Sequence, residues 1–222
     1  MPLFSHTYII KTGIKIMKKT VKLLATVMSA VLMLSVCSCN KADLKKSVDP
    51  VIGLMEDSIG KSRTDAEKMF EDYFGVELEG KESLKSGSDA NPLQTYFYPS
   101  VLTKDGVTFT SMAITETMSD GIVYSVELNN NNLNTANNEY NTSSEKKSEI
   151  KNLCKAMNKA VEERAGKPMS TMPLFENSKL SFSNRYKTDK CMYIVSNRDL
   201  TEMPEEEGHK LIDTTVMIYQ IT

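Results

Sequence analysis

The fold of this chain is decided by residues 95–128, which read TYFYPSVLTKDGVTFTSMAITETMSDGIVYSVEL. Apolar and polar residues alternate with the period of a β-strand over three segments: residues 95–98, 107–117 and 122–128. The pairs Asp105-Gly106 and Asp120-Gly121 stand between these segments, and Asp-Gly is a strong signal for a tight hairpin turn. The sequence therefore predicts an antiparallel meander of three strands. Four residues are expected to form its buried face: Ile122, Tyr124, Val126 and Leu128.

A helix is predicted ahead of this meander. Thr64-Asp65-Ala66-Glu67 has the form of a capping box, and Gly75 is placed to end the helix. Apolar residues recur at helical spacing between these two signals: Ala66, Met69, Phe70, Tyr73 and Phe74. Further upstream, Asp49-Pro50 is typical of a helix start, so a short helix is expected over residues 49–59.

The same order of elements recurs in the second half of the chain. A longer helix is predicted to begin at Thr142 or Ser144 and to end at residues 165–168, which read AGKP. Its apolar face is expected to contain Ile150, Leu153, Cys154, Met157 and Val161. Three more strands are predicted after it: residues 180–186, 191–196 and 211–221.

Residues 129–144 separate the two halves. This segment contains eight asparagines and no aliphatic residue except Leu133 and Ala136, which is typical of a flexible linker. The predicted organisation is a signal peptide over 1–38, a polar tether over 39–48, a first unit over 49–128, the Asn-rich linker over 129–144 and a second unit over 145–222. The fold class is α+β, with two helix-plus-three-strand units forming antiparallel sheet that helices cover on one face. Because each half is small, we expect the halves to share one sheet or a packed interface.

The element order and the helix terminators, Phe74-Gly75 and residues 165–168, give the chain a family resemblance. It is similar to the helix-plus-antiparallel-sheet repeats of β-lactamase-inhibitor-like proteins and of small envelope lipoproteins. The likeness spans most of residues 50–222 and implies a binding or scaffolding module, without a functional motif. The absence of Trp from the sequence departs from the aromatic-rich binding faces of the inhibitor proteins.

The first 38 residues have the character of a secretory signal. Lys18, Lys19 and Lys22 precede an apolar run over residues 23–36, which is too short for a membrane-spanning helix. Met17 followed by two lysines is typical of a bacterial start, so residues 1–16 are expected to lie upstream of the natural start or to extend the basic region.

Ser38-Cys39 resembles a bacterial lipobox, in which a small residue precedes the cysteine that receives acyl chains such as palmitate. Cys39 is therefore the predicted lipidation site. Cys37 is a less favoured alternative, because Val36 precedes it, although Leu34 suits the position three residues before Cys37. An ordinary cleaved signal or an N-terminal anchor also stays open.

The net charge of the chain and its expected location in the envelope limit the classes of partner that it can bind. Removal of residues 1–38 takes away five lysines and no acidic residue, which leaves a net charge of −7. This acidic balance argues against nucleic-acid binding. The expected partners are the membrane, through the N-terminal lipid, and another envelope protein. The segment after Cys39 lacks the acidic cluster that resembles a surface-export signal, so a periplasm-facing position is favoured.

Two cysteines remain in the mature chain, Cys154 and Cys191. The envelope compartment permits a disulfide between them. Alternatively, both are buried free thiols that act as small hydrophobic residues, because Cys154 lies on the apolar helix face and Cys191 begins a predicted strand.

The sequence offers little for catalysis or for a cofactor. His209 is the single histidine of the mature chain, and no nucleotide-binding, zinc or nucleophile motif is present, so neither a catalytic residue nor a cofactor is predicted. A weak candidate for a cation site lies between the last two strands: Glu202, Glu205, Glu206, Glu207 and His209. A solvated acidic loop is the alternative interpretation of this segment.

The favoured function is a lipid-anchored envelope protein with a non-catalytic binding or scaffolding role. The alternative is a hydrolase that acts on envelope glycan or peptide. Its support is the compartment and the abundance of acidic residues, 29 in all, from which a catalytic pair cannot be selected.

Overall fold

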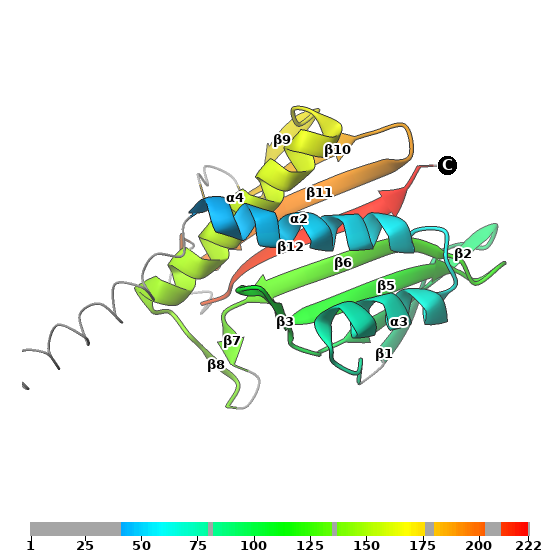
Figure 1. The fold of residues 1–222 in the computed structure, drawn as a ribbon, viewed down its shortest axis with the longest axis horizontal. Helices are drawn as coiled ribbons and strands as arrows, with labels where there is room; N and C mark the ends of the chain where they lie inside the picture. The colour runs from blue at the N-terminus through cyan, green and yellow to red at the C-terminus, as the bar shows by residue number, and fades with distance from the viewer. Residues whose placement is uncertain (1–40, 80–81, 135–136, 176–179, 203–209, 222) are drawn as a thin grey trace, which may run out of the picture. The chain divides into compact units, whose positions relative to one another are not determined.

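The computed structural model describes residues 41–79, 82–134, 137–175, 180–202 and 210–221. Within these ranges the chain is of the α+β class, as predicted, with three α-helices and a large antiparallel sheet. The helices are α2 (Lys41–Ser58), α3 (Arg63–Phe74) and α4 (Ser144–Ala165). Figure 1 shows all three on the same face of the sheet.

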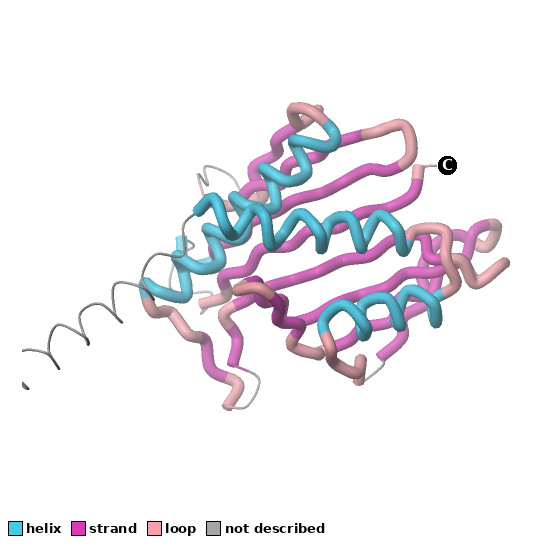
Figure 2. Tube along the Cα trace, in the orientation of Figure 1, coloured by secondary structure: helices cyan, strands magenta, loops and turns pink. Residues whose placement is uncertain are grey.

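The sheet contains eight strands and joins both halves of the chain. Its order is β1 (Glu82–Ser88), β2 (Asn91–Tyr98), β5 (Ser111–Thr117), β6 (Val123–Asn131), β12 (Ile212–Gln220), β11 (Cys191–Asp199), β10 (Phe182–Lys187) and β9 (Ser170–Pro173). The halves meet where β6 pairs with β12, with Val126 opposite Ile218. Figure 2 shows the strands as one continuous layer behind the helices. The expectation of one shared sheet is confirmed, but each half contributes four strands to it, where three were predicted.

The first Asp-Gly pair forms its predicted hairpin, although not within the main sheet. Asp105 and Gly106 have φ of 50° and 79° and connect β3 (Leu102–Lys104) to β4 (Val107–Phe109). The strand predicted over 107–117 is interrupted at Thr110, so that β4 leaves the line of β5. The hairpin contacts α2, α3 and β6, which places it between the helices and the sheet.

A register shift changes the predicted buried face of β6. The pairing with β5 passes from Ser125 directly to Val123 and leaves Tyr124 without a partner in the ladder. Because a bulge adds one residue to the strand, the residues before it point to the opposite face from the one that simple alternation predicts. Val126 and Leu128 are buried as expected, and Val123 is buried in place of Ile122 and Tyr124. The prediction was wrong for Ile122 and Tyr124, both only partly buried. The ring of Tyr124 lies 6.1 Å from that of Tyr219.

The segment expected to be a polar tether is helical from Lys41 onward. Val48 is fully buried, and it continues the apolar stripe of α2 through Val51, Ile52 and Met55. Lys45 forms an ion pair with Glu163 of α4. The tether prediction was therefore wrong for residues 41–48, because the helix starts upstream of the Asp49-Pro50 signal and contains Pro50.

The Asn-rich segment is ordered where the structure describes it. Asn129, Asn130 and Asn131 belong to β6, and Asn130 and Asn132 are buried. A two-stranded hairpin follows, formed by β7 (Leu133–Asn134) and β8 (Glu139–Tyr140). The prediction of a flexible linker was wrong here, because the buried amides bond to the backbone: Asn130 donates to the Thr108 carbonyl at 2.6 Å.

Candidate functional site

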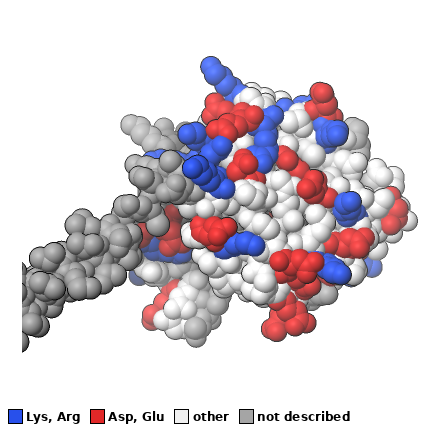
Figure 3. Space-filling model, viewed as in Figure 1, with Lys and Arg blue, Asp and Glu red and all other residues white. Residues whose placement is uncertain are grey.

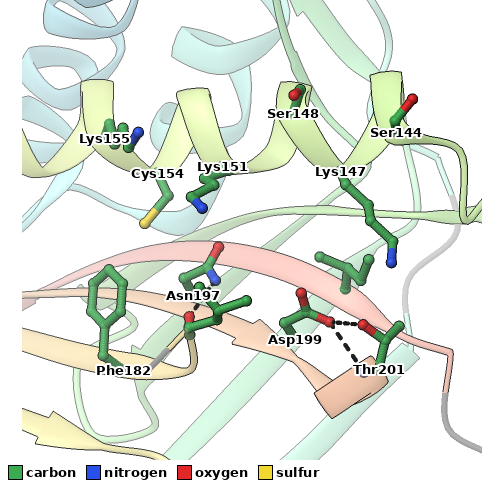
Figure 4. Close-up of a pocket in the computed structure, with 12 residues that line it drawn as sticks. Ser144, Lys147, Ser148, Lys151, Cys154, Lys155, Phe182, Asn197, Asp199 and Thr201 are labelled. Atoms are coloured by element: carbon green, nitrogen blue, oxygen red, sulfur yellow. Dashed lines mark hydrogen bonds between the residues drawn. The ribbon is translucent and has the colours of Figure 1, made fainter. Parts of the chain in front are cut away.

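A cavity of about 490 Å³ lies between α4 and the ends of β10, β11 and β12. Figure 4 shows the helix on one side of it and the strands on the other. The helix contributes Ser144, Lys147, Ser148, Lys151, Cys154 and Lys155. The sheet side contributes Leu180, Phe182, Asn197, Asp199, Thr201 and Ile212. We call this cavity the α4 pocket.

Helix α4 is fixed in place by an N-terminal cap and by a buried apolar face. The side chain of Ser143 caps the helix by accepting a hydrogen bond from the Lys146 amide at 3.2 Å, one residue away from either predicted cap. The predicted apolar face is confirmed, since all five of its residues are buried: Ile150, Leu153, Cys154, Met157 and Val161. This face packs on β10, β11 and β12. The pocket opens along the edge of that packing.

The inner wall of the pocket is largely apolar. Ile212 is buried, and Phe182 and Leu180 lie partly exposed along the opening. The Cys154 thiol lies 4.0 Å from the Ser196 carbonyl oxygen and 3.4 Å from the Asn158 amide nitrogen. Burial raises the pKa of this thiol to about 11, so it is protonated at neutral pH. It therefore acts as part of the apolar wall and not as a nucleophile.

Asn197 brings an unsatisfied acceptor to the pocket. Its side chain is 7% exposed, and its Nδ2 donates to the Leu180 carbonyl at 2.6 Å. Its Oδ1 has no hydrogen-bond partner, which is true of no other buried side-chain oxygen or nitrogen in the described part of the chain. Figure 4 shows the Asn197 amide between the strand and α4. A buried acceptor left without a donor costs about 1–3 kcal/mol, so a donor on a ligand would be stabilising at this atom.

Three lysines follow the helix side of the pocket. Lys147, Lys151 and Lys155 recur every four residues and so share one line along α4. Within the described ranges none of the three forms an ion pair, whereas Lys146 on the neighbouring line pairs with Glu149 at 2.8 Å. Figure 3 shows acidic and basic side chains mixed over the helical face of the molecule, so the lysine row is a local feature.

One carboxylate is found among the described residues that line the pocket. Asp199 accepts hydrogen bonds from the backbone amide of Thr201 at 3.1 Å and from its hydroxyl at 2.5 Å. Thr201 is in a short 3-10 helix, η1 (Leu200–Glu202). Asp199 is thus occupied in ordering the turn after β11, and the lysines outnumber it.

A second polar cluster lies on the sheet face that the helices leave uncovered. Arg198 donates to both carboxylate oxygens of Asp213, with its Nε at 3.1 Å from Oδ2. Burial, and then the charge of Asp213, raise the pKa of Glu127. Glu127 and Asp213 lie on β6 and β12, away from the α4 pocket.

The proposed cation ligands fall mostly outside the described residues. Glu205, Glu206, Glu207 and His209 lie in the segment 203–209, and of Glu202 the structure describes only the backbone at the end of η1. In the ranges that are described, no three His, Cys, Asp or Glu residues gather closely enough to hold a metal ion. The cation site stays a prediction.

Cys154 and Cys191 do not form the disulfide that was considered. Both are buried free thiols, as the alternative interpretation expected. The Cys154 sulfur lies against Ser196, five residues along β11 from Cys191. At about 3.3 Å per strand residue, this separates the two positions by roughly 16 Å, far beyond the reach of a disulfide.

The structure does not test the predicted lipidation site. Cys39 and its alternative Cys37 lie outside the described residues. Of the helices in residues 41–221 that the structure describes, none is long and apolar enough to cross a membrane.

The pocket was not predicted from the sequence, although two of its features leave a trace there. Lys147, Lys151 and Lys155 stand at helical spacing beside the apolar face of α4. Asn197 occupies an inward position of its strand, in phase with the buried Val195 and Tyr193. A polar residue at such a position indicates a functional or specially bonded site. The cavity itself depends on how the helix sits on the sheet, which the sequence does not show.

Comparison with known proteins adds no family: no family model matches the chain, and no curated protein or solved structure is significantly similar to it. No residue role can therefore be carried over from a relative. The assignment of the site depends on the cavity, the unpaired Asn197 acceptor and the lysine row.

Proposed function

We propose that this protein is a lipid-anchored protein of the bacterial envelope that binds a ligand in the α4 pocket without converting it. The observation that carries the proposal is the pocket itself, a cavity of about 490 Å³ with an apolar wall and one buried, unpaired acceptor. Ligand sites are typically concave, largely apolar and of about 300–1,000 Å³, with a few polar groups that orient the ligand.

The composition of the pocket favours binding over hydrolysis. Glycoside hydrolysis by the common mechanisms uses two carboxyl groups on either side of the bond, whereas Asp199 is the one carboxylate among the described residues of the lining. The Cys154 thiol, with its raised pKa, is a poor nucleophile. Hydrolysis at this site would need groups that the described lining residues do not provide.

We infer further that the body consists of two related helix-and-sheet units. Helix α3 precedes β1, β2, β5 and β6, and α4 precedes β9, β10, β11 and β12. In both units the last strand, β6 or β12, lies at the centre of the sheet and the first strand, β1 or β9, lies at its edge. This arrangement supports the resemblance to β-lactamase-inhibitor-like repeats and the binding or scaffolding role that the resemblance implies.

The anchoring part of the proposal depends on the sequence before Lys41. It is supported by the basic residues before the apolar run, by the apolar run over residues 23–36 and by Ser38-Cys39. Metabolic labelling with an alkyne analogue of palmitate should label the wild-type chain and the Cys37→Ser variant, but not Cys39→Ser. The Cys39→Ser protein should leave the membrane fraction once its signal is removed. Labelling of Cys39→Ser at wild-type level would contradict the assignment.

The binding part can be tested on the anchored protein as the cell makes it. Native mass spectrometry of the full mature chain, extracted in mild detergent, should detect a small molecule retained in stoichiometric amount. Washing under denaturing conditions should release it. Absence of any retained molecule, together with no melting-temperature shift in an extract of envelope small molecules, would contradict a binding function.

A further inference from the structure

We propose that the α4 pocket takes a small apolar carboxylic acid that also carries a hydroxyl or amide N–H donor. Hydroxy fatty acids and N-acyl amino acids both have this chemistry. The inference rests on the proposed binding function and adds the chemical class of the ligand. Three independent features of the pocket lead to it: an apolar wall, a buried acceptor and a row of three lysines that form no ion pair with the described residues.

The apolar wall selects the body of the ligand. This wall offers few hydrogen-bonding groups, because it is formed by Phe182, Ile212 and the protonated thiol of Cys154. It therefore favours an alkyl chain or a similar apolar group. Removing such a group from water contributes about 0.8 kcal/mol for each buried CH₂. A highly polar ligand such as a free sugar would lose its hydration against this wall without replacement.

The buried acceptor selects a donor. Asn197 Oδ1 is already desolvated and has no partner, while its Nδ2 is fixed by the Leu180 carbonyl. The amide is therefore held in one orientation and cannot rotate to satisfy its oxygen without losing the 2.6 Å bond. A site of this kind discriminates against analogues that lack the donor, because they leave the acceptor unpaired.

The lysine row selects a negative charge. Lys147, Lys151 and Lys155 span about 12 Å along the helix at 1.5 Å per residue. In Figure 4, Lys147 points from α4 toward the strand side, at the end where Asp199 and Thr201 lie. Asp199 disfavours an anion at that end, so the carboxylate is expected beside Lys151 and Lys155.

The experiment measures the affinity of the full mature chain for four probes by isothermal titration calorimetry. They are 3-hydroxydecanoate, decanoate, decane-1,3-diol and N-octanoylglycine. We expect both donor-bearing acids to bind about tenfold more tightly than decanoate, since one satisfied buried hydrogen bond corresponds to about that ratio. The diol has the donor without the charge and should also bind more weakly than 3-hydroxydecanoate. The stronger of the two donor-bearing acids identifies the source class.

Two variants assign these preferences to residues. Lys151→Gln combined with Lys155→Gln should weaken the binding of both donor-bearing acids by about five- to tenfold and leave the binding of the diol unchanged. Lys159→Gln is the matched control, because Lys159 is exposed on the same helix and does not line the pocket. Asn197→Leu should remove the advantage of 3-hydroxydecanoate over decanoate. If Asn197→Leu does not fold, the ratio of the affinities of the wild-type chain for 3-hydroxydecanoate and decanoate still decides whether the buried acceptor binds a donor.

Equal affinity for decanoate and 3-hydroxydecanoate would overturn the role of Asn197. Equal affinity for the diol and the hydroxy acid would overturn the role of the lysines. If no probe binds at millimolar concentration, the ligand class is wrong. In that case a retained molecule of another class in native mass spectrometry leaves the binding function standing, whereas the absence of any retained molecule removes both.

Discussion

The guanidinium of Arg164, near the end of α4, donates to both the carboxylate and the backbone carbonyl of Asp49 in α2, the latter at 2.9 Å. Its Nε also lies 3.2 Å from a carboxylate oxygen of Glu56, two turns further along α2. One side chain thus fixes the helix that follows the N-terminal segment to the helix that forms one side of the pocket. This contact adds to the packing of α4 on the sheet and to the Lys45–Glu163 ion pair in positioning the helix that forms one side of the pocket.

Arg164→Gln should lower the free energy of unfolding by about 1–2 kcal/mol. Hydrogen bonds to charged groups contribute more than that when buried, but Asp49 is 40% exposed, so solvent screening reduces the effect. Urea unfolding followed by circular dichroism at pH 7 provides the measurement. Lys159→Gln, an exposed change on the same helix, should stay within about 0.5 kcal/mol of wild type.

The pH dependence of this effect has a definite sign. Hydrogen bonding to Arg164 lowers the pKa of Asp49 below its usual value of 3.8, so the folded protein favours the carboxylate form. The contribution is therefore fully present above the usual pKa and is lost as the pH falls through the lowered one. The difference between wild type and Arg164→Gln should shrink when unfolding is measured at the lowest pH at which both proteins fold. A difference that grows at low pH would show that Arg164 acts through another contact.

Asn132→Ala should destabilise the protein by about 2–3 kcal/mol. The buried side chain of Asn132 accepts from the Ile212 amide at 2.8 Å and donates to the carbonyls of Lys210 and Asn141 at 2.8 and 3.1 Å. Its removal leaves buried backbone groups without partners. Asn137→Ala is the control, because Asn137 is exposed and should change stability by less than about 0.5 kcal/mol. Equal effects of the two substitutions would mean that the segment is a flexible linker after all.

Glu127→Gln should raise the melting temperature at neutral pH. Burial, and then the neighbouring charge of Asp213, raise the pKa of Glu127, so ionisation of this residue opposes folding. For an acid with a raised pKa in the folded state, stability falls as the pH rises from the usual pKa through the raised one. The gain from the substitution should therefore be largest near pH 7 and vanish below about pH 4. Glu145→Gln, in the first turn of α4, should instead lower stability by a few tenths of a kcal/mol, because an acidic side chain there complements the helix dipole.

The elements that local rules specify were predictable from sequence. The Asp105-Gly106 turn has the positive φ values that this pair favours, and the apolar face of α4 is buried at every predicted position. Helix α3 ends at Gly75 as expected, with φ of 69°, although its cap is Ser62 and not the predicted Thr64. These features depend on neighbours three or four residues away, which is the range over which sequence patterns carry information.

Features that depend on tertiary contacts were not predictable. Strand β1 has the sequence ESLKSGS, with no apolar alternation, because it is an exposed edge strand that pairs through its backbone. The bulge at Tyr124 reverses the phase of β6 on one side, and no local pattern marks it. The buried asparagines were mistaken for a linker because their partners, such as Ile212, lie some 80 residues away. For the same reason, Asn197 could be recognised as a site residue only after α4 was placed over it.

The reactivity of Cys154 provides a test of the pocket that is independent of binding affinity. With a pKa raised to about 11, only about one thiol in a thousand is ionised at pH 8, so alkylation by iodoacetamide should be slow in the folded protein and rapid in denaturant. Cys191, whose pKa burial also raises, is the internal control, because it lies at the far end of β11 and does not line the pocket.

Saturating 3-hydroxydecanoate should slow alkylation of Cys154 severalfold and leave the rate at Cys191 unchanged, because a ligand in the α4 pocket covers only the first thiol. Peptide-level mass spectrometry over a time course separates the two rates in one sample. Equal slowing at both cysteines would indicate that the ligand stabilises the whole fold from another site, since both thiols then react through the same global opening. Unchanged alkylation of Cys154 with the ligand bound would place the ligand outside the α4 pocket.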